Sequence, residues 1–167
     1  MMVPAPLMRR LRRPADSLPA AYAPSASPWL GAWDVVTVPD GDDIVVKQGI
    51  RYAHVRLWGA DAPEQGQPVA AVARWWLSDF VSVNPVTLYR RGSASYGRIV
   101  CQVFNSSGQD VALLLLAKGL AWYSSWYAPG QTAYADAQQY ARLYRLGIWA
   151  DCQPVAPWTF RARWKGQ

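Results

Sequence analysis

Residues 33–58 read WDVVTVPDGDDIVVKQGIRYAHVRLW, and this stretch decides the fold. It contains three runs rich in Val, Ile, Tyr and Trp, a composition typical of β-strands. Two turn signals, Pro39-Asp40-Gly41 and Gln48-Gly49, separate these runs. The stretch therefore predicts three consecutive strands joined by tight turns, at residues 33–38, 44–47 and 52–58.

Beyond these strands, apolar residues recur at spacings of three and four, which is typical of an amphipathic helix. Pro68 suits the first turn of this helix, which we expect to run to Phe80. Two more strand-like runs follow, at residues 86–89 and 99–104. They flank a predicted loop over residues 90–98.

Helical spacing returns twice in the rest of the chain, at about residues 111–118, before Gly119, and at residues 132–146. The resulting order is β-β-β-α-β-β-α-α with short strands. This order predicts an α+β protein, a five-stranded OB-fold β-barrel with about three α-helices.

The chain divides by composition into three parts. Residues 1–32 are rich in Pro, Ala and Arg without a period and are interpreted as a flexible leader, residues 33–150 as the domain, and residues 151–167 as a C-terminal extension. The segment PADSLPA is too polar for the apolar region of a signal peptide, so the sequence predicts none. The location stays open between secreted, periplasmic and cytoplasmic. No run approaches the roughly 20 apolar residues of a membrane-spanning helix, and we expect no membrane partner.

The net charge is +6 with a pI near 9.6, which favours polyanionic partners such as nucleic acids. The chain also has 10 Trp and 9 Tyr, which suit base stacking or a Trp-rich core equally well. The basic cluster Arg9–Arg13 adds nonspecific DNA affinity or belongs to the leader, and the sequence does not decide.

Histidine and cysteine are scarce. His54 is the only histidine, which argues against Ser-His and zinc-based hydrolysis, and we expect it to have a surface or packing role. Cys101 lies in an apolar run and is interpreted as a buried free thiol. A bridge between Cys101 and Cys152 remains the alternative.

Three short blocks hold charged residues with no obvious structural purpose: Asp40–Asp43, Arg56–Glu64 and Tyr96–Arg98. Each block alone has an ordinary explanation, as a hairpin turn, a helix cap or a hairpin end. Together they supply oxygen ligands, two guanidinium groups and a further carboxylate. This combination favours metal-assisted hydrolysis of a phosphodiester.

In the order of these blocks the chain resembles the staphylococcal nuclease-like (thermonuclease) family from about Trp33 to Trp149. Later motifs extend the resemblance, namely Gly119-Leu120-Ala121, Tyr127-Ala128-Pro129 and Gly147-Ile148-Trp149. The tail from Pro154 to Arg161 resembles an extension of bacterial members.

The resemblance implies a role for each matching residue. Calcium would be bound by Asp42, Asp61 and the main-chain carbonyl of Ala62. Arg56 and Arg98 would hold the scissile phosphate, and Glu64 would position or deprotonate the attacking water. Tyr96 and Tyr127 would contact the nucleotide.

Four positions depart from the family pattern. Asp43 and Ala62 stand where Thr is common, Ala94 replaces an acid, and Ser125 replaces an aromatic residue whose place Trp122, Tyr123 or Trp126 could take. Asp43 either strengthens metal binding or faces water, and we expect the second.

The resemblance implies a monomeric Ca²⁺-dependent endonuclease that acts on DNA and RNA, with single-stranded or locally open substrate favoured. The alternative is a catalytically inactive OB-fold module that binds nucleic acid or protein. The physiological substrate and any preference between DNA and RNA stay open.

Overall fold

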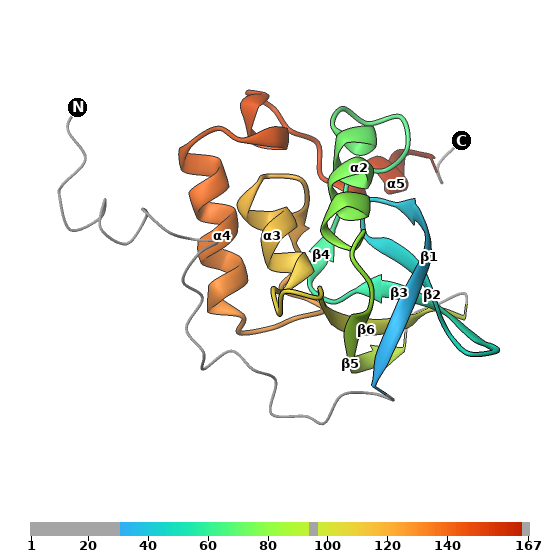
Figure 1. Ribbon diagram of the computed structural model, residues 1–167. Helices are drawn as coiled ribbons and strands as arrows, with labels where there is room; N and C mark the ends of the chain where they lie inside the picture. Colours follow the sequence, from blue (N-terminus) through green and yellow to red (C-terminus); the bar gives the residue numbers. More distant parts are fainter. Residues whose placement is uncertain (1–30, 94–96, 165–167) are drawn as a thin grey trace, which may run out of the picture.

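The computed structural model describes residues 31–93 and 97–164. Five strands form a closed barrel in the order β1-β2-β3-β6-β5 (Figure 1), with β3 and β6 parallel and the other neighbours antiparallel. The strands are β1 (Ala32–Asp40), β2 (Asp43–Gln48), β3 (Arg51–Leu57), β5 (Val86–Ser93) and β6 (Ile99–Phe104). The predicted OB-type barrel is confirmed.

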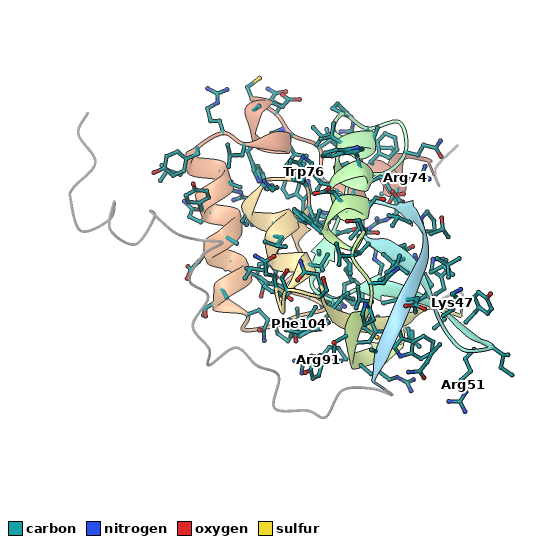
Figure 2. The ribbon with its side chains drawn as sticks, in the orientation of Figure 1. Lys47, Arg51, Arg74, Trp76, Arg91 and Phe104 are labelled. Carbon is teal, nitrogen blue, oxygen red and sulfur yellow. The ribbon has the colours of Figure 1, made fainter. Side chains whose placement is uncertain are left out.

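Strand β5 is longer than the sequence indicates. It runs to Ser93, so Arg90 and Arg91 lie in the strand and not in a loop. Pairing with β6 explains the extension, because Arg90 is opposite Cys101 and the register shifts between Arg90 and Gly92. Arg91 (Figure 2) donates a hydrogen bond to Gln102 of β6 at 2.6 Å.

Helices lie outside the barrel, some against its strands and one against another helix (Figure 1). They are α2 (Ala70–Phe80), α3 (Val111–Ala117), α4 (Thr132–Leu143) and α5 (Pro157–Trp164), with a 3₁₀ turn, η2 (Gly147–Ala150). The described residues thus contain four α-helices where about three are expected, and α5 is the addition. Asp110 caps α3 by accepting a hydrogen bond from the Leu113 amide.

A second, two-stranded sheet is too short to show in the sequence pattern. It pairs β4 (Ala60–Asp61) with β7 (Trp122–Tyr123). The Ser124 amide extends the contact by donating to the Gly59 carbonyl at 3.0 Å. This sheet fixes the segment that follows β3 against the segment that follows α3.

The barrel interior is apolar and closely packed. Ile44, Val46, Val55, Leu88 and Cys101 all have 0% exposed surface. Burial raises the pKa of the Cys101 thiol to about 12. Cys101 and the exposed Cys152 are both free, so the buried-thiol interpretation is confirmed and the alternative bridge is absent.

Two motif glycines mark a close backbone crossing. The Gly119 carbonyl accepts a hydrogen bond from the Ile148 amide at 2.9 Å. A Cβ at Gly119 would lie 2.2 Å from the Leu146 carbonyl oxygen, and one at Gly147 would lie 2.1 Å from the Gly119 oxygen. Both residues also have positive φ, so a side chain fits neither position. Across residues 31–93 and 97–164, no helix is long and apolar enough to cross a membrane.

Candidate active site

The candidate site lies where three chain segments meet at one end of the barrel. Asp42 is in the turn between β1 and β2, and its carbonyl accepts a hydrogen bond from the Leu57 amide at 2.9 Å. A Cβ at Gly41 would lie 2.8 Å from the Cβ of Ala62, so only glycine allows the turn to approach β4 this closely. The hairpin register then places Asp43 opposite Arg56.

Arg56 bridges two buried carboxylates. Its Nη1 lies 2.7 Å from Asp42 Oδ1, and its Nη2 lies 2.6 Å from Asp61 Oδ1. Asp42 is 1% exposed and Asp61 is 5% exposed. Because one guanidinium touches both side chains, the two carboxylates lie within reach of a single cation.

Burial disfavours the charge on Asp42. Desolvation raises its pKa to about 8, although Arg56 and the Ala62 amide act in the opposite direction. Desolvation alone would favour neutral Arg56, but the charges of Asp42 and Asp61 raise its pKa above the ordinary value. Asp42 Oδ1 is buried and accepts no well-oriented hydrogen bond despite its contact with Arg56. Within the described residues its one close contact is the ion pair with Arg56, which leaves a second lone pair on this oxygen for a cation.

The donors available for a metal are few and consist of oxygen. The Ala62 amide donates to Asp42 Oδ2 at 2.6 Å, so the main chain at Ala62 runs beside the Asp42 carboxylate. The part of the chain that the structure describes contains no cluster of three or more His, Cys, Asp or Glu side chains set to hold a metal. Two carboxylates with a main-chain carbonyl and water fit calcium, which accepts irregular oxygen shells.

Glu64 adds a third carboxylate on the loop after β4. Its side chain is 28% exposed and accepts a short hydrogen bond from Arg161 of helix α5. The same guanidinium contacts Asp61 at 2.8 Å. The sequence identifies Glu64 and Asp61, but it does not identify Arg161 as their neighbour.

Arg98 directly precedes β6 and is held by Asp43. Its Nη1 lies 2.9 Å from Asp43 Oδ2, and His54 Nε2 lies 3.7 Å from the same oxygen. Asp43 is only 6% exposed, so the expectation that it faces water is wrong. The contact between Asp43 and Arg98 follows from the parallel pairing of β3 with β6, because this pairing brings the start of β6 next to the β2–β3 hairpin. The His54 side chain is 40% exposed, so the expected surface or packing role stays a prediction.

Comparison with known proteins places the chain in a family. Residues 54–151, more than half of the chain, match the family described as staphylococcal nuclease homologue. The chain belongs to the staphylococcal nuclease family. The resemblance seen in the sequence motifs is therefore confirmed.

Relatives in this family carry nuclease names. The chain is 33% identical over 129 residues to an "Uncharacterized endonuclease" of Escherichia coli, covering 77% of this chain and 84% of the relative. It is 33% identical over 132 residues to a protein of the same name in Haemophilus influenzae, covering 78% and 73%. It is 31% identical over 137 residues to "Micrococcal nuclease" of Shigella flexneri, covering 77% and 79%.

The side of this staphylococcal nuclease family member that we expect to contact bases is more exposed to solvent than Asp42 and Asp61 are. Tyr127 is 67% exposed, and its carbonyl accepts a hydrogen bond from the Trp58 indole at 2.9 Å. Tyr96, the other residue expected to contact the nucleotide, lies outside the described residues. The loop that carries Tyr127 follows β7 and so lies beside β4, which carries Asp61.

Three aromatic residues near Ser125 differ in their availability. The Trp122 ring packs against Trp149 at 4.3 Å, and the Tyr123 hydroxyl donates to the Ala128 carbonyl at 2.6 Å. Trp126 is 88% exposed. Of the three, Trp126 is the one whose ring is free to stack on a base.

Proposed function

We propose that this protein is a calcium-dependent endonuclease that hydrolyses phosphodiester bonds of DNA and RNA. The observation that carries the proposal is the meeting of Asp42, Asp61 and Arg56 at one end of the barrel, with Glu64 bridged to Asp61 through Arg161. Family membership and the names of the relatives support a nuclease. We expect single-stranded or locally open nucleic acid as substrate and a monomeric enzyme.

The proposed roles follow from the chemistry of each group. Asp42, Asp61 and the Ala62 carbonyl would hold calcium, which would supply positive charge for the phosphate and would lower the pKa of a bound water. Arg56 and Arg98 offer planar forks that match phosphate oxygens and favour the charge that develops on them. Glu64 would accept a proton from the attacking water or orient that water.

The nucleotide side of the proposal rests on Tyr127 and on Tyr96 by resemblance. An exposed ring beside the site can stack on a base, and stacking tolerates any base because every base has a π-face. Trp126 adds a second exposed ring on the same loop.

An inactive binding module is the alternative, and one feature argues against it. Asp42 and Glu64 are linked to Asp61 through the guanidinium groups of Arg56 and Arg161. Arg98 is also present and is paired with Asp43. A barrel that only binds nucleic acid has no need of buried carboxylates, because they repel phosphate.

The proposal predicts cleavage that depends on calcium. Single-stranded DNA incubated with the protein and millimolar calcium is expected to be cut, and EGTA is expected to stop the reaction. Restoring excess calcium should recover the rate, which excludes damage by the chelator. An intact substrate in the presence of calcium contradicts the nuclease proposal, and equal rates with calcium and EGTA contradict the calcium dependence alone.

We also expect Asp43 to set the orientation of Arg98. Asp43→Asn keeps the shape of the side chain but removes the charge that holds Arg98 Nη1. Because a misplaced phosphate contact slows chemistry, we expect about a tenfold lower rate of DNA cleavage.

The matched control for Asp43→Asn is Asp34→Asn, which removes an exposed carboxylate from the neighbouring strand β1. Rates of DNA cleavage by both variants test whether Asp43 orients Arg98. Equal rates for Asp43→Asn and Asp34→Asn would show that Arg98 does not need its carboxylate partner.

A further inference from the structure

Helix α5, Pro157–Trp164, lies beyond the matched family segment 54–151 but reaches into the candidate site. Arg161 donates from Nη2 to Asp61 Oδ2 at 2.8 Å and from Nη1 to Asp61 Oδ1 at 3.1 Å. Its Nη1 also donates to Glu64 Oε1. One guanidinium therefore joins a proposed metal ligand to the proposed base.

Apolar contacts hold α5 in addition to these ion pairs. A Cβ at Gly66 would lie 3.9 Å from the Phe160 ring, so this ring covers the loop after Glu64. The Trp158 ring packs against Trp122 with centroids 5.5 Å apart, and Ala156 is buried. Apolar packing and the ion pairs of Arg161 together hold α5 against the site.

Gln67 ties the Glu64 loop to the same C-terminal segment. Its Oε1 accepts a hydrogen bond from the Glu64 amide at 2.8 Å, and its Nε2 donates to the Val155 carbonyl at 2.8 Å. Gln67 itself is 9% exposed. The main chain of Glu64 and the base of α5 are therefore held in a fixed relation.

The Glu64 carboxylate, by contrast with its main chain, contacts a single partner within the described residues. Within residues 31–93 and 97–164, Arg161 is its only hydrogen-bonding or ion-pair partner. Glu64 and Asp61 carry like charges and would repel each other without a cation between them. A flexible glutamate side chain with no partner would spread over several rotamers.

We propose that Arg161 is a positioning residue of the active site, which holds the Glu64 carboxylate beside Asp61. The inference rests on the proposed nuclease function. The inference also concerns calcium binding. Arg161 forms an ion pair with Asp61, the carboxylate that would bind calcium, so the two cations compete for it. Arg161 therefore orients Glu64 and, at the same time, weakens calcium binding.

The test is Arg161→Gln, which keeps much of the side-chain length and removes the charge and the fork. We expect kcat for single-stranded DNA to fall about tenfold, since Glu64 spends less time in its working position. KM should stay within about twofold, because Arg161 is not assigned to the substrate. Thermal unfolding confirms that the variant is folded.

Calcium binding to the protein without DNA gives the second readout. Titration calorimetry is expected to show calcium binding about threefold to fivefold tighter in Arg161→Gln, as one partly exposed competing charge is removed. A role of Arg161 in structure alone would loosen Asp61 and weaken calcium binding instead. An unchanged kcat, or a calcium affinity that is unchanged or weaker, overturns the proposal.

Arg163→Gln is the matched control, with the same change of charge at an exposed position of the same helix. It should leave kcat and calcium affinity within about twofold of the wild type; equal effects of both variants overturn a specific role for Arg161. A wild-type protein that does not cut DNA overturns the proposed function, whereas an active wild type matched by Arg161→Gln overturns this inference alone.

Discussion

Glu64→Gln is expected to lower kcat for DNA cleavage by about 10²–10⁴, the range typical of the loss of a general base. The amide has the shape of the carboxylate, and its oxygen can still accept the hydrogen bond from Arg161. The amide cannot accept a proton from water at neutral pH. Steady-state rates at saturating calcium measure the effect, and KM should change little because Glu64 is not assigned to phosphate binding.

Glu64 is a clear target because it is the only glutamate among the 167 residues. Asp79→Asn serves as the control, since Asp79 is an exposed carboxylate on α2 away from the site contacts. We expect Asp79→Asn to cleave at the wild-type rate. A Glu64→Gln enzyme within about twofold of the wild type would remove Glu64 from the reaction and leave the metal and arginines to explain it.

The carboxylates and the arginine that we propose for the metal and the phosphate were predictable, because these residues lie in short ordered motifs. The strand pattern of residues 33–58 predicts three consecutive antiparallel strands. Pairing of the second strand with the third places Asp42 beside Arg56. Asp61 follows directly on the third strand. The sequence therefore contains both the residues and the local geometry that brings them together.

Contacts across long sequence separations were not predictable from one sequence. The partner of Asp43 is Arg98, 55 residues away, and it depends on the parallel pairing of β3 and β6. Arg161 lies 97 residues from Glu64 on an eight-residue helix. The tail from Pro154 to Arg161 resembles an extension of bacterial family members, but nothing in its local sequence indicates where it packs.

The two-stranded sheet of β4 and β7 is not predictable from the sequence, for a different reason. Each strand has two residues, which is too short for an alternating pattern to be visible. The sheet nevertheless fixes Asp61 against Trp122 and so positions a proposed metal ligand.

Arg56→Lys is expected to lower kcat by about 10²–10³, although it keeps the positive charge. Lysine still offsets the buried charges of Asp42 and Asp61, so we expect the fold to survive. It cannot present a planar pair of donors to a phosphate while it also bridges two carboxylates. The rate of cleavage at saturating calcium, with unfolding temperature as the check on folding, measures the effect.

Arg51→Lys is the matched control, because Arg51 begins the same strand and lies at the outer end of the β2–β3 hairpin (Figure 2). It is exposed, and the same substitution there should leave the rate unchanged. An Arg56→Lys enzyme as active as Arg51→Lys would mean that a point charge suffices at this position. Arg56 would then act by neutralising Asp42 and Asp61, and the bidentate hold on the phosphate would fall to Arg98 alone.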